Sequence, residues 1–441
     1  MIPSKRILLT TFGSYGDIHP YLAIAAELSS RGHRPVIATS DLYREKLVAG
    51  GFDFVPVRPN IPPPQEQDPE MMAKVMNPKS GAGFLLNEML FPHLRDGYED
   101  LLSAVAGADL LLTHPISFAG PLVAQKTGLP WVSSVLAPVS FMSAYDPPLP
   151  PFWPWIRHVQ LLGPRFVAAF FKQVKKYYRN KGYDEFREEL GLPDRGSPVF
   201  EGQHSPTLIL ALFSGLFAQP QPDWPPQARV TGFAFYDGRN ELAMPPELIR
   251  FLDDGPPPIV FTLGSSAVWV ARDFYHESIA AAKLLARRAV LLIGDERNRL
   301  EGSLPPEIIA VNYAPFEALL PSACAMVHHG GVGTTSNGLR AGIPTLIVPF
   351  AFDQPDNAAH AARLGCSRTL PREKYYAARV AKELDILLTK PEHTSKAREM
   401  GRLLRMENGA AVAADLIEQV LQAEDGVMVA GLEEPVYAAC D

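Results

Sequence analysis

Short apolar segments alternate with longer segments of helical periodicity along most of the chain, and this alternation is the strongest constraint on its fold. The strand-like segment Ile7–Thr11 leads through a glycine-containing turn into a helical face over Pro20–Ser30, and Val36–Thr39 follows as a second buried strand. Strands and helices that alternate in this way form parallel sheets, because each helix returns the chain across one face of the sheet. The pattern therefore predicts the α/β class.

The alternation occurs in two blocks. Apolar strand candidates of the first block are Leu110–Thr113, Trp131–Leu136, Leu208–Leu212 and Arg229–Phe233, and those of the second are Pro258–Leu263, Ala289–Ile293, Ala325–His328 and Thr345–Pro349. A chain of 441 residues is also too long for one ordinary hydrophobic core. We expect two doubly wound, Rossmann-like domains, divided as follows: residues 1–236, a linker at 237–246, a second domain at 247–395, and C-terminal helices with a tail at 396–441.

Composition excludes several classes of protein. A formal net charge of -7 argues against a broad grip on a nucleic-acid backbone. Cys324, Cys366 and Cys440 are scattered without a C-x-x-C pair, so neither a disulfide scaffold nor a zinc site is indicated. The N-terminus lacks the pattern of a signal peptide, and no apolar run reaches about 18 residues, the length of a membrane span. We expect a cytoplasmic protein.

The segment His328–Thr335, HHGGVGTT, contains the densest group of glycines at a strand-to-helix junction. It follows the strand Ala325–His328 and precedes a helix expected from about Thr334 to Gly342. Glycines let a ligand approach the backbone closely, and the free N–H groups and dipole of the helix N-terminus favour a diphosphate. The structural alternative is a plain strand-to-helix turn, which also favours glycine and threonine.

Other motifs stand at consistent distances around this loop. They are Gly264-Ser265-Ser266, Asn312-Tyr313-Ala314-Pro315, Gly342-Ile343-Pro344 and Asp353-Gln354. Together they resemble the GT-B glycosyltransferases that act on lipids, sterols and natural products, whose donor signature runs from an aromatic-Ala/Val-Pro through H-x-G-x-x-[ST]-T and A-G-[VI]-P to D-Q. The resemblance spans residues 313–357 and implies two domains facing each other across a cleft, with a nucleotide-sugar site in the second.

The resemblance also assigns roles to individual residues. It implies that the ring of Tyr313 stacks on the uracil of UDP-glucose, that Ala314 meets the base edge, and that Asp353 and Gln354 bind the hexose. The residues implied to hold the diphosphate are Ser265, His329, Gly331, Val332, Gly333 and Thr334. For Tyr313 a packing role, and for Asp353 a helix-capping role, are the structural alternatives.

Two positions depart from the family pattern. Asn337 occupies the place of a Glu that binds the ribose hydroxyls in many members, and Phe316 occupies the place of a frequent Gln. The nucleotide therefore stays open between UDP and TDP, and the sugar between glucose, rhamnose and other hexoses, although UDP-glucose is the expected donor.

The sequence GSYGDIHPY, Gly13–Tyr21, forms a similar junction in the first domain. NAD binding is disfavoured, because the spacing is not G-x-G-x-x-G and Asp17 would repel a pyrophosphate. The resemblance implies instead the motif G-[ST]-x-G-D-x-x-P, whose Asp deprotonates the acceptor hydroxyl. We therefore expect Asp17 to be the catalytic base, with His19 as its rival. His114 follows a strand end near where some relatives place the acid that orients their base, and is a weaker candidate.

No prosthetic group or metal is expected. The chain contains no D-x-D sequence, and the helix terminus near Thr334 can stabilise a departing diphosphate. An inverting, metal-independent transfer of a hexose to a small hydrophobic or aromatic acceptor follows from these expectations. Two alternatives stay open: a GT-B enzyme of another reaction, such as an epimerase, and a catalytically silent donor-binding subunit that activates a partner.

Residues 141–195 interrupt the strand–helix alternation with a segment rich in proline and aromatic side chains, followed by a basic helical segment. Its aromatic residues include Phe152, Trp153, Trp155, Phe166, Phe170, Phe171, Tyr177 and Tyr178. They suit either a lid over an apolar acceptor pocket or the ordinary packing of an insertion. The lysines and arginines suit a solvated face, which is favoured, or a weak contact with a membrane surface through residues 156–181.

Overall fold

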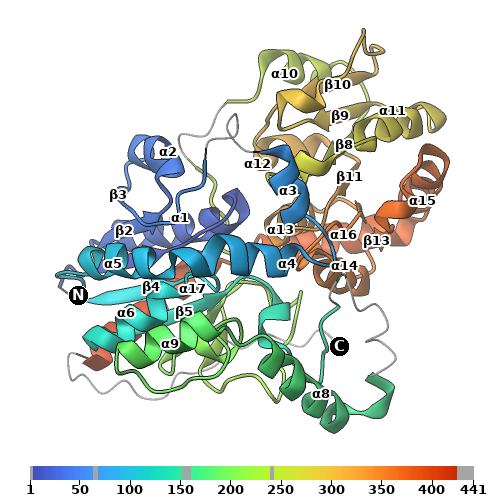
Figure 1. The fold of residues 1–441 in the computed structure, drawn as a ribbon. Helices are drawn as coiled ribbons and strands as arrows, with labels where there is room; N and C mark the ends of the chain where they lie inside the picture. The colour runs from blue at the N-terminus through green and yellow to red at the C-terminus, as the bar shows by residue number, and fades with distance from the viewer. Residues whose placement is uncertain (1–2, 63–67, 150, 152–159, 239–242, 425–441) are drawn as a thin grey trace.

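Two parallel sheets form the core of the protein (Figure 1). The computed structural model describes residues 3–62, 68–149, 151, 160–238 and 243–424. Within these residues the first sheet has seven strands in the order β3-β2-β1-β4-β5-β6-β7, and the second has six in the order β10-β9-β8-β11-β12-β13. The predicted pair of doubly wound domains is confirmed.

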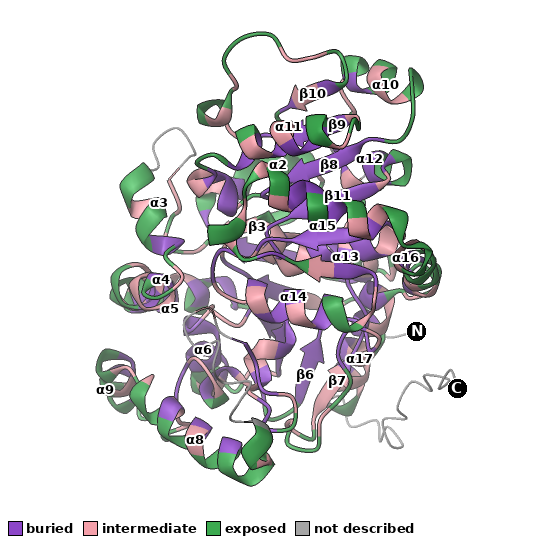
Figure 2. Ribbon diagram, turned by 90° about the vertical axis from the view of Figure 1, so that its right-hand side faces the viewer, coloured by how far each residue is buried: buried purple, intermediate pink, exposed green. Residues whose placement is uncertain are grey.

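The strands of the first sheet are β1 (Arg6–Thr10), β2 (Arg34–Thr39), β3 (Asp53–Pro56), β4 (Leu110–Thr113), β5 (Trp131–Val135), β6 (Leu208–Ala211) and β7 (Ala228–Val230). Those of the second are β8 (Ile259–Thr262), β9 (Ala289–Leu292), β10 (Ile308–Val311), β11 (Ala325–His328), β12 (Thr345–Ile347) and β13 (Ser367–Thr369). The central strands are buried on both faces, as their continuous apolar sequences require (Figure 2).

Helices cover both sheets. In the first half they are α1 (Tyr15–Ser30), α2 (Arg44–Ala49), α3 (Pro69–Val75), α4 (Gly81–Phe84), α5 (Leu94–Ala104), α6 (Ala119–Thr127), α8 (Pro164–Tyr177) and α9 (Lys181–Glu189). In the second half they are α10 (Pro246–Asp253), α11 (Phe274–Leu284), α12 (Phe316–Leu319), α13 (Val332–Ala341), α14 (Gln354–Arg363), α15 (Ala377–Thr389), α16 (Pro391–Leu404) and α17 (Gly409–Glu424). None of the helices among the described residues is long and apolar enough to cross a bilayer.

The sequence prediction differs from the structure at the sheet edges and at the first helix. The strands β3, β10 and β13 were not predicted, and each lies at an edge of its sheet. Helix α1 begins at Tyr15, five residues before the predicted start at Pro20, because Ser14 and Asp17 cap its N-terminus. Asp17 therefore lies in the first turn of the helix.

Segments of each half pack against the other half. Helix α17 at the end of the chain packs against α1, and its buried Ile417 belongs to the core of the first sheet. Met76, directly after α3, is buried in the core of the second sheet. Arg31 at the end of α1 forms ion pairs with Asp415 and Glu418 of α17. The two halves are thus joined by contacts remote from the linker.

The insertion between β5 and β6 lies against α14 of the second half. The buried backbone N–H of Leu149 donates to Asp356 Oδ1 over 3.0 Å. Asp146 accepts two hydrogen bonds from Arg363, at 2.8 and 3.0 Å. Phe171 of α8 is buried in a small cluster that Ala359 of α14 contacts. Of the predicted aromatic residues of the insertion, Phe152, Trp153 and Trp155 lie outside the described residues.

Candidate donor and catalytic site

The glycine-rich segment connects the C-terminal end of β11 to the N-terminus of α13. Gly331 is the N-cap of this helix, and Val332, Gly333 and Thr334 form its first turn. The backbone N–H groups of a first turn have no partners within the helix, so they can donate to an anion. The segment is the strand, glycine turn and helix N-terminus that its sequence predicted.

The ring of His329 fills a narrow space between two glycines. A Cβ on Gly331 would lie 2.5 Å from His329 Nε2, and a Cβ on Gly264, whose φ is +61°, would overlap the same ring. Burial lowers the pKa of His329 to about 4, so the imidazole is neutral at pH 7. A neutral ring can still donate one N–H to an anion.

Asp353 and Gln354 stand at the start of α14, next to the glycine loop. The side-chain Oε1 of Gln354 accepts the backbone N–H groups of Phe350 and Ala351 at 2.8 and 3.0 Å. Its carbonyl is therefore engaged, and its NH₂ group is the part left to bind a ligand. Phe352 has a φ of +55°, an uncommon conformation of a kind that concentrates at functional sites.

Asn357, one turn along α14, connects Asp353 to the glycine loop. Its Nδ2 donates to Asp353 Oδ2 over 2.7 Å and to the carbonyl oxygen of Gly330 over 3.0 Å. Gly330 has a φ of +94°, and a Cβ there would crowd Ile347 and the backbone of Gln354. No role was predicted for Asn357, although its i+4 spacing from Asp353 was a usable signal.

The Asp353 carboxyl titrates near neutral pH. Burial raises its pKa to about 7, the hydrogen bond from Asn357 lowers it, and the carboxylate of Asp17 raises it further. Asp17 belongs to the first half of the chain, so this electrostatic interaction acts between the two halves.

The other predicted donor-site residues lie within α13 or in the segments that follow β8 and β10. Ser265 is exposed after β8, and after β10 Ala314 is buried next to Tyr313, a residue that is 42% exposed. Asn337 Nδ2 donates to the Gly333 carbonyl over 2.8 Å, and its Oδ1 accepts from Arg340 over 3.2 Å. The Asn337 side chain is thus held within its own helix.

Asp17 is fixed through one of its two carboxylate oxygens. Its Oδ2 accepts the backbone N–H of Ser14 at 2.7 Å and the Ser14 hydroxyl at 3.1 Å. Gly13, with a φ of +129°, leaves the space that the carboxylate fills. Asp17 Oδ1 lies 3.4 Å from His114 Nε2, and one third of the side chain is exposed, at 33%.

The two histidine candidates are placed differently. The ring of His114 is buried after β4 and approaches Asp17. The ring of His19 lies among Tyr15 and Tyr236, and its Nε2 is 3.4 Å from Lys46 Nζ. The structure therefore groups His114, and not His19, with Asp17.

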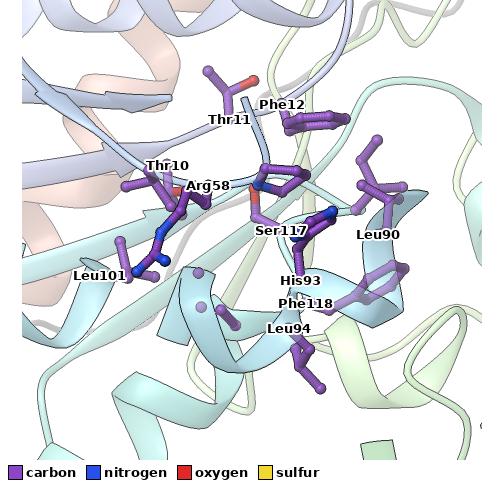
Figure 3. Close-up of a pocket in the computed structure, with 16 residues that line it drawn as sticks. Thr10, Thr11, Phe12, Arg58, Leu90, His93, Leu94, Leu101, Ser117 and Phe118 are labelled. Carbon is purple, nitrogen blue, oxygen red and sulfur yellow. The ribbon is translucent and has the colours of Figure 1, made fainter. Parts of the chain in front are cut away.

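A small cavity lies beside the segment that follows His114. It lies between the C-terminal end of β1 and helix α5, with Phe12, Leu90, Leu94 and Phe118 among its apolar walls (Figure 3). Ile116, two residues after His114, also lines it. Its volume of about 40 Å³ suits a few water molecules and is far below that of a pocket for a drug-sized ligand.

The N-termini of α1 and α13 face each other between the two sheets. A Cβ on Gly333 would lie 3.8 Å from the Cα of Gly16, which precedes Asp17. The carboxylate of Asp17, the N-terminus of α13 and the carboxyl group of Asp353 therefore lie around one interface. Among the described residues, no group of three or more His, Cys, Asp or Glu side chains is placed to hold a metal ion.

Two facing parallel-sheet domains with this arrangement define the GT-B class of nucleotide-sugar enzymes, and comparisons with known proteins agree. Residues 278–418 match the family of the erythromycin biosynthesis protein CIII-like C-terminal domain. O-mycaminosyltylonolide 6-deoxyallosyltransferase of Streptomyces fradiae is 30% identical over 424 residues, which cover 94% of this chain and 97% of that protein. The chain belongs to the GT-B glycosyltransferases and is itself a glycosyltransferase.

Other relatives differ more in length or sequence. Sterol 3-beta-glucosyltransferase of Leptosphaeria maculans is 28% identical over 94% of this chain, which spans only 29% of that longer protein. Among solved structures, the glycosyltransferase of kitacinnamycin aligns with a TM-score of 0.70 at 23% identity, covering 95% of this chain and 100% of that one. The glycosyltransferase VinC in complex with DTDP aligns with a TM-score of 0.66 at 22% identity, covering 95% and 100%. These structural similarities concern the fold.

Proposed function

We propose that the protein transfers a hexose from a pyrimidine nucleoside diphosphate to a hydroxyl of a hydrophobic or aromatic small molecule, with inversion at the anomeric carbon. The observation that carries this proposal is the position of Asp17 opposite the first turn of α13, given by the approach of Gly16 to Gly333. A base in the first domain would thus face the donor in the second.

The proposed reaction is a single displacement. Asp17 Oδ1 accepts the proton of the acceptor hydroxyl as that oxygen attacks the anomeric carbon, and the bond from that carbon to the diphosphate oxygen breaks. Oδ1 suits this role because Oδ2 is already occupied by Ser14. The nucleoside diphosphate leaves with the electron pair, and the N–H groups of residues 332–334 with the neutral His329 stabilise its charge. We propose that the reaction requires no metal.

The remaining donor-site residues would bind the nucleotide and sugar. Tyr313 would stack on the pyrimidine with Ala314 at its edge, and Ser265 would assist at the diphosphate. Asp353 would accept hydrogen bonds from two hexose hydroxyls. Gln354 would donate through its NH₂ group, since its carbonyl is engaged by the backbone.

The donor nucleotide is proposed to be UDP or TDP, with UDP-glucose as the first donor to test. Asn337 offers one amide oxygen where a Glu would accept hydrogen bonds from both ribose hydroxyls. The 2′-hydroxyl, which UDP has and TDP lacks, should therefore add little binding affinity here. VinC, which was solved with DTDP, has the same fold.

We expect Asn337→Glu to raise the ratio of kcat/KM for UDP-glucose over TDP-glucose by about tenfold, because its carboxylate can bind the extra hydroxyl while Arg340 holds it in place. Asn337→Gln, which is of the same length without the charge, is the control. An unchanged ratio in Asn337→Glu would remove this residue from nucleotide selection.

Donor binding should also depend on pH through Asp353. Its pKa of about 7 means that the carboxylate, the form that accepts hydroxyls, predominates only above pH 7. We expect the donor KM to rise by about tenfold from pH 8 to pH 6, and this rise to be absent in Asp353→Asn. Between about pH 4 and pH 7 the folded protein without ligand keeps the proton of Asp353, whereas the unfolded chain has released it. The contribution of Asp353 to the free energy of unfolding therefore falls as the pH rises through this range.

The acceptor is proposed to lie in the cleft between the domains, covered by the insertion. The cavity of about 40 Å³ in the first domain, which neither Asp17 nor His114 lines, is too small to hold an acceptor. The insertion is attached to α14 through Asp356 and Arg363, on the helix that begins with Gln354. Two relatives support large apolar acceptors by their names: the O-mycaminosyltylonolide 6-deoxyallosyltransferase and the sterol 3-beta-glucosyltransferase.

We also propose a weak contact of α8 with anionic lipid. Leu161 and Leu162, just before α8, and Phe166 within it are exposed, at 84%, 61% and 52%, and Lys172 and Lys176 of α8 are exposed as well. Vesicles of phosphatidylcholine with phosphatidylserine should carry part of the protein upward in a flotation gradient, and high salt should abolish this.

In the flotation experiment, the double variant Lys172→Glu/Lys176→Glu should stay at the bottom of the gradient. Lys382→Glu/Lys390→Glu, an equal charge change at two exposed lysines of α15 and its C-cap, should float like the unmodified protein. Equal flotation of both variants, or none for the unmodified protein, would show that this face is simply solvated.

The proposed activity is tested by measuring nucleoside diphosphate release with and without an acceptor panel of phenols, sterols and macrolides. Acceptor-dependent release supports the transferase. Donor binding without release would support the catalytically silent subunit, although no particular feature of the site favours that alternative. An altered sugar nucleotide without glycoside would indicate an epimerase.

A further inference from the structure

His114 is a buried side chain whose protonation pattern can be deduced from its contacts. Its Nδ1 accepts the backbone N–H of Ile116 over 3.2 Å. Accepting a hydrogen bond requires a lone pair, so Nδ1 carries no proton and the ring proton of the neutral imidazole lies on Nε2. His114 therefore presents an N–H group from its other side.

That N–H group points toward Asp17. Nε2 is buried and has no hydrogen-bond partner among the described residues, and it lies 3.4 Å from Asp17 Oδ1. A buried donor without a partner is destabilising, so a nearby carboxylate oxygen is a favourable neighbour. The distance is slightly long for a hydrogen bond, but contacts of catalytic groups often shorten only when substrates bind.

Asp17 has one carboxylate oxygen, Oδ1, that Ser14 does not hold. Ser14 holds only Oδ2, so the carboxylate can still swing about that anchored oxygen. We propose that His114 is a positioning residue that donates from Nε2 to Asp17 Oδ1 and fixes the plane of the carboxylate. The second lone pair of Oδ1 then faces the acceptor hydroxyl. This inference rests on the proposed role of Asp17 as the base.

The competing explanation is that His114 only shapes the turn after β4. It accepts from Ile116 through Nδ1, and its carbonyl accepts the N–H of Ser117 over 3.0 Å. Two amide substitutions distinguish the turn role from the positioning role. The amide group of an Asn side chain reaches only the position of Nδ1, whereas the NH₂ of a Gln side chain reaches the position of Nε2. His114→Asn keeps an acceptor for the turn, and His114→Gln keeps a donor for Asp17.

The positioning role predicts a kcat about 10- to 100-fold lower in His114→Asn and within about threefold of normal in His114→Gln, with donor KM unchanged in both. Thermal unfolding of both variants establishes that they are folded. Normal kcat in His114→Asn would overturn the proposal, and so would an equal loss in His114→Gln.

A double-mutant cycle adds a readout that a structural role would not produce. In the background of Asp17→Asn, His114→Asn should cause no further loss, because the carboxylate that it positions is gone. An equal loss in both backgrounds would overturn the proposal while leaving Asp17 as the base. Near-normal turnover of Asp17→Asn alone would instead refute the base assignment, so the two failures are distinguishable.

Discussion

Asp17→Asn should lower kcat by at least about 100-fold while the affinity for the donor nucleotide stays within about threefold of normal. The factor is typical for the loss of a general base. An asparagine retains a side-chain oxygen that can accept the Ser14 N–H, so the cap of α1 is kept and only the basic group is lost. The measurement is steady-state turnover together with calorimetric titration of UDP.

Asp41→Asn is the matched control for this variant. Asp41 is a half-exposed carboxylate after β2 that pairs with Arg44, and it also lies at the C-terminal edge of the first sheet. We expect normal turnover in the control. Equal turnover in Asp17→Asn and Asp41→Asn would contradict the assignment of Asp17, and lost UDP binding in Asp17→Asn would show that its role is structural.

Gly331→Ala should weaken donor binding by about 100-fold. The backbone at Gly331, with φ of -57° and ψ of 141°, is one that alanine adopts without strain, so the effect comes from the added methyl group. That group would lie 2.5 Å from His329 Nε2, and Gly264 closes the other side of the ring. His329 must therefore leave its place between the two glycines, and small displacements of binding groups are costly.

Gly83→Ala provides the control for this second prediction. Gly83 lies in α4, and a Cβ there would meet nothing within 4 Å. The dissociation constant for UDP, measured by calorimetry, should be normal in the control and raised in Gly331→Ala. A normal constant in both variants would mean that the glycine loop does not hold the diphosphate.

The central strands could be predicted because they are continuous apolar runs, but three of the four edge strands, β3, β10 and β13, were not. β13 (Ser367–Thr369) contains two hydroxyl residues and an arginine, and β3 (Asp53–Pro56) begins with a charge and ends with a proline. Edge strands have one solvated side and need neither high hydrophobicity nor a regular pattern. Their pairing depends on the neighbouring strand, which local sequence does not reveal.

The proposed donor site was more visible in the sequence than the proposed pairing of His114 with Asp17. The glycine loop and Asp353-Gln354 belong to consecutive strand–helix units, so their spacing is informative. His114 follows β4 and Asp17 follows β1, and only the adjacency of β1 and β4 in the sheet brings them together. The engaged carbonyl of Gln354 depends likewise on a local loop conformation that residue types do not specify.

The most direct test of the account is mass spectrometry and NMR of products formed from UDP-glucose or TDP-glucose with the mixed phenol, sterol and macrolide panel. The account predicts a glycoside with the anomeric configuration opposite to that of the donor, formed by the unmodified protein and not by Asp17→Asn. A glycoside with retained configuration, or donor binding with no glycoside from any acceptor, would contradict it.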